Sequence, residues 1–489
     1  MKHALFLKSS FLGFTLGVVV WSSQAKESPN ILFIIADDAS RHFGQAYDCD
    51  WVRTPNIDKL AEEGVVFDNA YVATAKCAPC RASIMTGRFP WQIEAGANHQ
   101  NVFPDNYPAF GEVLQAAGIQ TGAVGKTWGP GTAHHVDGSA RDFGLTVISK
   151  KKVPDDFFGN FLKARKEGAP AFFYWHGSSD PHRGYQKGSG IAAGKKLSDI
   201  DHVPAYWPDN DIVRGDMLNY SIEVERFDTH VGELLADLEA SGEAENTLVI
   251  VTSDHGMPFP RVKGHTFDDA HRVPLVMRWP AGIKNPGRRV EELVSFVDFA
   301  ATFIDLQQGD SEAMGMELSG KSLADLLRDE PSHPRDFVLI GRERNDVYAR
   351  PGSPSGLGYP ARGIRMGDYL YVHNFEPDRW PCGNIELGLR DTDRGPTKSF
   401  LMKMDMETAF WKHNFGKRPA DMLFNVVEDP DCVANLATDG SQAGRLKDMK
   451  KRMLQELKEQ GDPRALGNGE VFDNYPTVKP APNGWETKK

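Results

Sequence analysis

Short apolar runs alternate with amphipathic stretches between about residues 29 and 310, and this alternation limits the fold more than any other feature of the chain. The apolar runs predict buried strands, and the stretches with apolar residues at helical spacing predict helices. Strands that alternate with helices form a mostly parallel sheet covered on both faces. We therefore predict an α/β fold with a large mixed, mostly parallel sheet sandwiched by helices. The predicted strands are residues 30–36, 121–124, 171–176 and 247–252, and the predicted helices are residues 56–63, 109–117 and 211–240.

The pattern changes after about residue 335. Short runs at 337–340, 369–373 and 422–427 predict strands of a smaller antiparallel sheet, and residues 443–459 predict a terminal helix. Residues 461–489 are rich in proline and glycine, so we expect them to wrap the surface or fray. A chain of 489 residues is also too long for one small domain. We predict a large domain at residues 26–335 and a C-terminal α+β subdomain at residues 336–489.

The first 25 residues have the pattern of a signal peptide. Lys2 precedes an apolar run at residues 4–21, and small residues at positions 23 and 25 fit cleavage after Ala25. An uncleaved anchor is the alternative, but the uninterrupted apolar part is short for a membrane span. No later segment is apolar enough to cross a membrane. We expect the mature chain to begin near residue 26 and to be exported, either to the periplasm or out of the cell.

The net charge limits the partners. The chain has 56 basic and 67 acidic residues, a formal charge of −11. A general nucleic-acid binder needs a basic face, so we expect no nucleic-acid partner. An anionic small substrate is still allowed, because a site can be locally positive on an acidic protein.

Charged and metal-binding residues follow each of the four predicted strands. In open α/β sheets, ligands bind beyond the carboxyl ends of the strands. One aspartate after a strand is often only a cap or a turn residue. Four such segments at one sheet edge predict a functional site. The residues are Asp37 and Asp38, then Lys126, then Asp180 and His182, and finally Asp254 and His255.

Four of these residues predict a metal site. Asp37, Asp38, Asp254 and His255 supply three carboxylates and one imidazole. Oxygen-rich sets favour a hard divalent cation, so we expect Ca²⁺ or Mg²⁺. The one nitrogen ligand leaves Mn²⁺ or Zn²⁺ open.

The sharpest motif is Cys77-Ala78-Pro79-Cys80-Arg81, followed by a T-G pair and Arg88. Pro79 suits the first turn of a helix, so we place Cys77 at a helix N-terminus, where the helix dipole favours an anion. A C-x-x-C pair also suggests a redox or zinc site. A redox site would require a thioredoxin-like unit, and a zinc site would require a second pair of ligands. We find neither in the sequence. The chain has five cysteines, so at least one thiol is unpaired, and Cys77 is our candidate for a special fate.

These motifs resemble the formylglycine-dependent sulfatases of the alkaline-phosphatase superfamily. The family signature is C-x-P-x-R followed by T-G, and the order Asp-Asp, C-x-P-x-R, G-K, P-H, S-D-H-G matches across about residues 29–310. Residues 422–437 resemble the C-terminal subdomain of that family. The resemblance implies an alkaline-phosphatase-like fold, with residues 26–335 as a sulfatase catalytic domain.

The resemblance also implies a nucleophile and its cation. Cys77 would be oxidised to formylglycine (3-oxoalanine) by a maturation enzyme, either a formylglycine-generating enzyme or an anaerobic sulfatase-maturating enzyme. The aldehyde hydrates to a geminal diol, of which one oxygen attacks sulfur and the other later expels sulfate. Asp37, Asp38, Asp254 and His255 would hold the cation, with residue 77 nearby. The family often has Asn where this chain has His255.

Four further roles follow from the same resemblance. Arg81 would steady the modified side chain, and Lys126 and Lys263 would bind the sulfate oxygens. His182 would protonate the leaving group. These roles agree with the chemistry, because sulfate transfer builds charge on oxygens that cations stabilise, and a departing sugar oxygen needs a proton. Without the resemblance, each could be an ordinary surface or loop residue.

One position departs from the family. The usual G-K-x-H carries a histidine that helps the diol collapse, whereas this chain has Trp128 two residues after Lys126. Tryptophan cannot act as a base. His134 and His135 are the candidates to replace it, unless the metal-bound diol needs less help.

The substrate is less constrained. Asp180-Pro181-His182-Arg183, Gly256–Pro260 and Asn98-His99-Gln100 resemble the heparan N-sulfatase branch, but related bacterial enzymes also act on sulfated algal polysaccharides. We expect an exo-acting sulfatase on a sulfated carbohydrate and leave O-sulfate and N-sulfate open. The alternatives are an N-sulfoglucosamine sulfohydrolase, a phosphodiesterase or phosphonate hydrolase of the same superfamily, and a non-catalytic glycan-binding relative. The hypothetical substrate contacts are His99, Arg183, Arg342, Arg344 and Arg379.

Overall fold

The fold was analysed in a computed structural model, which describes residues 1, 28–149 and 156–479. The predicted signal peptide therefore lies outside the described residues, apart from Met1. Among the helices that the structure describes, none has the length and apolar character of a membrane span.

The larger part of the molecule is an eight-stranded sheet with the order β10-β2-β9-β8-β1-β7-β4-β6. Most neighbouring strands are parallel, and β9 alone runs antiparallel to its neighbours β2 and β8. The prediction of a large mixed, mostly parallel sheet is confirmed. The strands are β1 (Asn30–Ala36), β2 (Val65–Tyr71), β4 (Gln120–Gly125), β6 (Val147–Ser149), β7 (Phe172–Gly177), β8 (Thr247–Ser253), β9 (Leu275–Arg278) and β10 (Arg288–Ser295).

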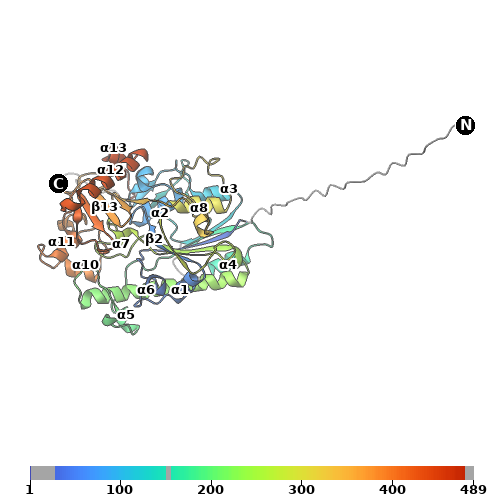
Figure 1. The fold of residues 1–489 in the computed structure, drawn as a ribbon, viewed down its shortest axis with the longest axis horizontal. Helices are drawn as coiled ribbons and strands as arrows, with labels where there is room; N and C mark the ends of the chain where they lie inside the picture. Colours follow the sequence, from blue (N-terminus) through green and yellow to red (C-terminus); the bar gives the residue numbers. More distant parts are fainter. Residues whose placement is uncertain (2–27, 150–155, 480–489) are drawn as a thin grey trace.

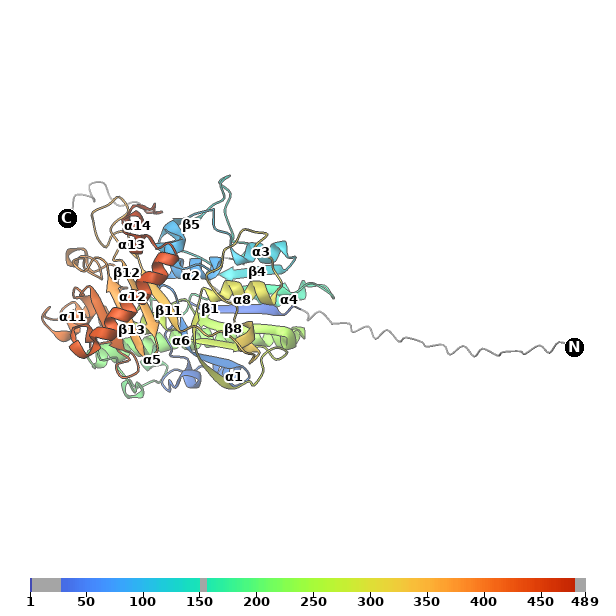
Figure 2. The ribbon, with the colours of Figure 1, turned by 45° about the horizontal axis from the view of Figure 1, so that its top comes forward.

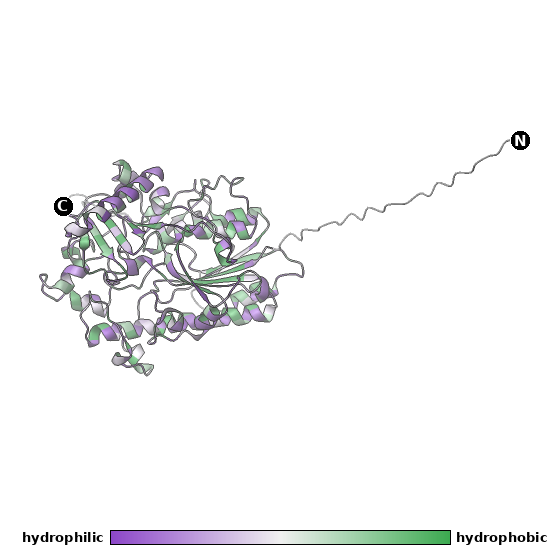
Figure 3. Cartoon of the chain, in the orientation of Figure 1, coloured by the Kyte–Doolittle hydropathy of each residue, from purple (hydrophilic) through white to green (hydrophobic). Residues whose placement is uncertain are grey.

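Helices cover both faces of this sheet, as the apolar character of its strands requires (Figures 1 and 3). Alternate side chains of β1 point to opposite faces, so Ile34 packs in one core and Phe33 in the other. Each face is covered by its own set of helices. On the Ile34 side lie α1 (Pro55–Glu62) and α6 (Asp211–Ser241), and on the Phe33 side lie α2 (Cys77–Thr86), α3 (Phe110–Ala116) and α8 (Asp298–Leu306).

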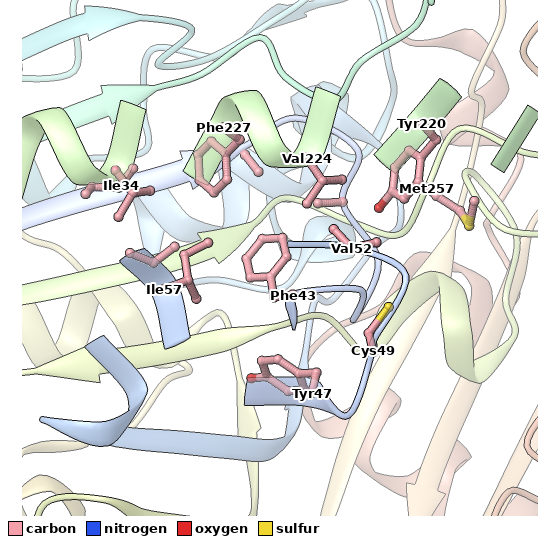
Figure 4. Packing of buried hydrophobic residues seen from close by; sticks show 14 of the residues in the cluster. Ile34, Phe43, Tyr47, Cys49, Val52, Ile57, Tyr220, Val224, Phe227 and Met257 are labelled. Atoms are coloured by element: carbon pink, nitrogen blue, oxygen red, sulfur yellow. The ribbon is translucent and has the colours of Figure 1, made fainter. Parts of the chain in front are cut away.

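The long helix α6 shows how the pattern of apolar residues becomes packing. Val224 and Phe227 are fully buried, and Phe227 lies 5.8 Å from the ring of Phe43 (Figure 4). Asn210 caps the helix by accepting hydrogen bonds from the N–H groups of Ile212 and Val213, and Gly242 ends it in the left-handed region. The predicted helix at 211–240 is thus confirmed within one residue.

The C-terminal part is a separate four-stranded antiparallel sheet, β11 (Phe337–Arg342), β12 (Ala361–Met366), β13 (Tyr369–Asn374) and β14 (Asp421–Asn425), in chain order. The helix α12 (Ala443–Glu459) lies across it and buries Met453 and Leu457 against it (Figure 2). The small antiparallel sheet and the terminal helix are confirmed. Strand β12 was not predicted, because its two arginines interrupt the apolar pattern although both are buried.

The expectation that the chain wraps the surface or frays after residue 461 is wrong for residues 462–474. Two short helices follow α12, namely α13 (Pro463–Leu466) and α14 (Val471–Asn474). Phe472 is fully buried, and the carboxylate of Asp462 accepts two hydrogen bonds, of 2.9 and 3.0 Å, from the guanidinium of Arg362 on β12. This buried pair docks the segment onto the C-terminal sheet.

The remaining elements are short and lie in the connections. They are α4 (Phe157–Lys163), α5 (Ser189–Ala192), α7 (Asp268–His271), α9 (Ala324–Leu327), α10 (Pro396–Leu401), α11 (Ala409–Phe415) and the two-stranded sheet of β3 (Asn101–Phe103) and β5 (Gly131–Ala133).

Candidate active site

The predicted site residues converge at one edge of the large sheet. Strands β8, β1, β7 and β4 are adjacent and parallel, so their carboxyl ends lie side by side. Hydrogen bonds tie the segments that follow them: the Asp38 N–H donates to Asp254 Oδ1 (3.1 Å), and the Asp37 N–H donates to the carbonyl of Asp180 (3.0 Å). The carboxylate of Asp180 itself turns away and pairs with Arg226 of α6.

An inner group of ligand atoms lies at the bottom of this site. One atom each from Asp37, Cys77, Asp254 and His255 lies within 4.8 Å of all the others, and all four residues are buried. Cys77 Sγ is 3.3 Å from His255 Nε2, which is also 3.2 Å from Asp38 Oδ1.

This inner group fits a divalent cation. Among the described residues, Asp38 Oδ1 is buried and accepts no hydrogen bond, although His255 Nε2 lies 3.2 Å away. A buried carboxylate oxygen without a hydrogen bond is costly unless a cation compensates it. His255 Nδ1 lies 3.0 Å from the carbonyl of Gly256, which holds the ring with Nε2 facing the group. Carboxylate oxygens with one imidazole suit a hard or borderline cation.

Three cationic side chains surround these carboxylates. Lys126 Nζ lies 2.6 Å from Asp37 Oδ1, and Lys263 Nζ lies 2.6 Å from Asp38 Oδ2. Arg81 is fully buried; its Nε donates to Asp254 Oδ2 (2.9 Å) and its Nη1 donates to the carbonyl of Lys126. The site therefore holds carboxylates and cationic side chains close together. Such an arrangement can bind an anion beside a metal ion.

These charges shift the pKa values of the buried groups. Burial raises the pKa of the Cys77 thiol, but Lys126 and Lys263 outweigh burial and lower that pKa to about 6. Burial likewise opposes ionisation of His255, yet Asp254 and Asp38 raise its pKa to about 9. For Asp37, Lys126 and Arg81 overcome burial and hold the pKa well below its usual range. The fold therefore favours an anionic group at position 77.

Helix α2 begins at Cys77, as the position of Pro79 predicted. The preceding Lys76 is extended and has no side-chain cap bond, so the first N–H groups of the helix are open towards the site. All five cysteines are free thiols, and Cys80 does not belong to either candidate metal group of the described chain. Among the described residues, Cys77 therefore shares a candidate metal group with Asp37, Asp254 and His255 and not with Cys80.

A second, outer group contains Asp38, His182 and Asp393, again with one ligand atom each within 4.8 Å. His182 Nδ1 lies 2.6 Å from the carbonyl of Arg183, which leaves Nε2 facing Asp38 Oδ2 at 3.9 Å. The His182 side chain is 38% exposed, so it lies at the mouth of the site.

Sequence reasoning missed two residues here, Asp393 and Lys76. Asp393 comes from an irregular segment before α10, with neither a strand nor a motif to mark it, and its Oδ2 lies 3.0 Å from Lys263 Nζ. Lys76 is buried. Burial is the main cause that lowers the pKa of His99, and the positive charge of Lys76 lowers it further. In the sequence, the one feature that could have pointed to Lys76 is its position directly before Cys77.

The guanidinium groups of Arg342 and Arg344, two predicted substrate contacts, are buried and have partners within the protein, and their contact with substrate stays a prediction. Arg342 pairs with Asp391 at 2.7 Å, and Arg344 donates to the carbonyl of Tyr475 at 3.3 Å. Arg183 also has a partner within the protein, since it donates two 2.9 Å hydrogen bonds to the carboxylate of Asp216.

The two other hypothetical contacts have different places. Arg379 pairs with Asp473 at 3.1 Å, beside α14. Burial lowers the pKa of His99, and the neighbouring charges of Lys76, Lys263 and Lys126 lower it further, as expected for a residue beside the site. Its Nδ1 lies 2.9 Å from the carbonyl of Asn345. Its contact with substrate stays a prediction.

The residue that departs from G-K-x-H does not face Cys77. Trp128 packs between Phe103 (centroids 5.5 Å apart) and Phe143 (5.6 Å). His134 and His135 are exposed, and His135 Nδ1 lies 3.1 Å from the carboxylate of Asp105. Neither histidine is among the groups with the largest effect on the pKa of Cys77, whereas His255 is in direct contact with Cys77.

Comparisons with known proteins agree with this geometry. The model of the family described as Sulfatase matches residues 29–309, more than half of the chain. An ulvan-active sulfatase of Formosa agariphila is 25% identical over 491 residues, covering 91% of this chain and 78% of that protein. Human N-sulphoglucosamine sulphohydrolase is 27% identical, covering 89% and 91%.

A solved structure has the same fold. BT4656, in complex with its substrate D-glucosamine-2-N,6-O-disulfate, superimposes with a TM-score of 0.63 at 20% identity, covering 89% of this chain and 99% of that one. The match over residues 29–309 contains Asp37, Cys77, Lys126, His182 and Asp254. The chain therefore belongs to the sulfatase family and is a sulfuric ester hydrolase.

Proposed function

We propose that this protein is an exported sulfatase that removes sulfate groups from a sulfated carbohydrate, with a formylglycine formed from Cys77 and a bound Ca²⁺ or Mg²⁺. One observation carries the proposal. Cys77 begins α2 with its sulfur 3.3 Å from His255, inside a buried group of carboxylates and lysines. An inert buried cysteine needs no such surroundings.

Asp37, Asp38, Asp254 and His255 would hold the cation. When bound, the cation supplies Lewis-acid stabilisation of negative charge on oxygen. Two observations support this assignment: among the described residues Asp38 Oδ1 accepts no hydrogen bond, and His255 Nε2 approaches that oxygen to 3.2 Å.

Formylglycine at position 77 would supply, as its hydrate, the oxygen nucleophile. The chain contributes an environment that favours negative charge there, through the N-terminus of α2 and the ammonium groups of Lys126 and Lys263. Arg81 cannot swing away, because it is buried and bonded to Asp254, so it fixes the segment that carries residue 77. The conversion requires a separate maturation enzyme as a partner.

Lys126 and Lys263 would bind the sulfate oxygens. Each ammonium already lies within 2.6 Å of a carboxylate, so it is held in place before substrate arrives. His182 would protonate the leaving oxygen, since its Nε2 faces the outer part of the site and its ring is held through Nδ1.

Two relatives support a carbohydrate substrate. Their names identify one as active on ulvan and the other as acting on N-sulphoglucosamine. We infer an exo-acting enzyme on oligosaccharides of a sulfated polysaccharide, such as an algal glycan, with the N-sulfoglucosamine sulfohydrolase as the alternative. Phosphodiester or phosphonate hydrolysis is not favoured, because the matching family model and these relatives are all sulfatases.

We also propose that the two domains divide between residues 335 and 336. We further propose that residues 1–25 are removed and that the protein is exported to the periplasm or out of the cell.

A substrate panel tests this proposal. The mature chain would be co-expressed with a formylglycine-generating enzyme and incubated with N-sulfoglucosamine, heparan fragments, and ulvan, fucan and carrageenan oligosaccharides. Sulfate released from an algal oligosaccharide, and not from N-sulfoglucosamine, supports the O-sulfatase. Release from N-sulfoglucosamine alone supports the alternative. Release from none of them, with residue 77 converted as judged by mass, contradicts a carbohydrate sulfatase.

A further inference from the structure

Asp393 places a carboxylate on the outer side of the site, among groups proposed to bind an anion. Its Oδ2 lies 3.0 Å from Lys263 Nζ, and one of its oxygens lies within 4.8 Å of a ring nitrogen of His182. A negative charge here repels sulfate, so sulfate binding alone does not account for it. Asp393 belongs instead to the outer group with His182, the proposed acid for the leaving oxygen, so the proposed function puts it on the side of the departing sugar.

Lys263 does not need Asp393 as a counter-charge. Its ammonium already lies 2.6 Å from Asp38 Oδ2, and that carboxylate is fully buried. Asp393 is instead 27% exposed, and within the described part of the chain its one ion pair is with Lys263. The carboxylate therefore has acceptor capacity left for a group that enters the site.

The segment that carries Asp393 is anchored on its N-terminal side. Two residues earlier, the carboxylate of Asp391 is buried and accepts hydrogen bonds from Arg342 (2.7 Å) and Arg350 (2.5 Å). The other oxygen of Asp391 accepts the N–H of Asp346 at 2.8 Å. A buried carboxylate with three donors fixes the backbone at this point.

The segment is anchored on its C-terminal side as well. Helix α10 lies beside α6 (Figure 1). Thr397, in the first turn of α10, donates its hydroxyl to Asp216 (2.8 Å) on α6, and the same carboxylate accepts two hydrogen bonds from Arg183. Gly395 lies so close to Arg183 that an added Cβ would be 2.6 Å from the guanidinium carbon. Arg183 and Arg342 thus position this segment, although the sequence suggested that they bind substrate.

We propose that Asp393 is a specificity-determining residue whose carboxylate accepts a hydrogen bond from a hydroxyl or ammonium group of the sugar that carries the departing sulfate. The inference rests on the proposed function and narrows its substrate class. It requires a donor on the sugar near the sulfated position, on the side of His182. A sugar without that donor leaves the remaining acceptor capacity of the carboxylate desolvated and without a hydrogen bond, which disfavours that sugar.

The test separates recognition of the sugar from binding of sulfate. Asp393→Ala and Asp393→Asn would be compared with the wild type on the best sulfated sugar from the panel, with inorganic sulfate as a sugar-free competitive inhibitor. Arg394→Ala, which changes an exposed neighbour in the same segment, is the matched control. Thermal unfolding would show that each variant is folded.

We expect Asp393→Ala to lower kcat/KM on the sulfated sugar about 10- to 100-fold, mainly through KM, because a hydrogen bond to a charged group is lost. Asp393→Asn, which keeps one acceptor oxygen, should lose less. The inhibition constant of inorganic sulfate should change less than about threefold or fall, since a repulsive charge has been removed. Deoxy and N-acetylated analogues of the sugar then distinguish the hydroxyl from the ammonium: the analogue that lacks the donor should be a poor substrate for the wild type and no poorer for Asp393→Ala.

Two results would overturn the role of Asp393. Equal weakening of sulfated sugar and inorganic sulfate would mean that Asp393 acts only through Lys263. Unchanged kcat and KM on the sulfated sugar would mean that Asp393 does not recognise the sugar. A wild type that releases sulfate from no member of the panel would refute the proposed function, and this role with it.

Discussion

The sulfur of Cys77 lies 3.3 Å from Nε2 of His255, so the first residue of α2 meets the loop that follows β8. The contact joins a helix on one face of the sheet to the carboxyl end of a central strand. Both residues are buried, and both carry strongly shifted pKa values because Lys126, Lys263 and two aspartates surround them.

Removal of the cation should abolish activity. If Asp37, Asp38, Asp254 and His255 hold a divalent cation, chelation leaves their carboxylates to repel one another, and activity should return when Ca²⁺ or Mg²⁺ is added back. Calcium at 100 times its Kd should also stabilise the fold by about 2.7 kcal/mol, seen as a rise in Tm.

The matched variant for that experiment is Asp254→Asn. This change should remove most of the calcium-dependent rise in Tm, whereas Asp50→Asn, at an exposed position, should keep it. Activity and Tm that are indifferent to chelation would contradict the metal site.

His182 should matter most for poor leaving groups. As a general acid, it should contribute about 10²- to 10⁴-fold to kcat on a sulfated sugar, so His182→Ala should lose that factor. An aryl sulfate leaves as a stabilised phenolate and should lose less than about tenfold. Equal losses on the two substrates would argue that His182 serves another purpose, such as holding Asp38.

The histidines after Lys126 should be dispensable. His134→Ala and His135→Ala should each retain kcat within about twofold, because both side chains are exposed and neither faces Cys77. Trp128→His, which restores the G-K-x-H pattern, should not raise kcat and should cost about 1–3 kcal/mol of stability, since the indole packs against Phe103 and Phe143. A faster Trp128→His enzyme would show that the ring can turn towards the site.

Arg362 should hold the C-terminal segment in place. Its guanidinium is buried between Glu343 (2.8 Å) and Asp462 (2.9 Å). Arg362→Met therefore leaves the Asp462 carboxylate buried without its guanidinium partner, whereas Glu343 keeps Arg464 at 2.9 Å. We expect a loss of about 3–5 kcal/mol in the free energy of unfolding, measured by urea titration. Lys447→Met, on the exposed side of α12, removes the same charge and should change stability by less than about 0.5 kcal/mol. Equal stability of the two variants would contradict the docking of residues 462–474.

The large sheet and the inner part of the site were predictable from sequence, because each depends on local pattern. The run at β1 is apolar throughout and is followed directly by Asp37 and Asp38, and parallel strands bring such residues together without further information. The start of α2 was predictable for the same reason, since Pro79 marks a first turn.

The remainder depends on contacts between distant segments. Strand β12 contains Arg362, and the sequence pattern predicts that an arginine lies at the surface. Arg362 is buried because it pairs with Asp462, which is 100 residues away in the sequence. The sequence does not show the partners of Arg342 and Arg183, because Asp391 and Asp216 lie 49 and 33 residues away from them along the chain. Asp393 was missed because only the fold brings it to Lys263.

The most direct test of the central claim is sulfate release by the matured wild type and by Cys77→Ala, on the same sulfated oligosaccharide and with the mass of residue 77 determined in each preparation. The account predicts that the wild type carries formylglycine and releases inorganic sulfate, and that Cys77→Ala unfolds at nearly the same temperature but is more than about 10³-fold slower. Equal release by the two proteins, or a fully converted wild type that hydrolyses only phosphate or phosphonate esters, would contradict it.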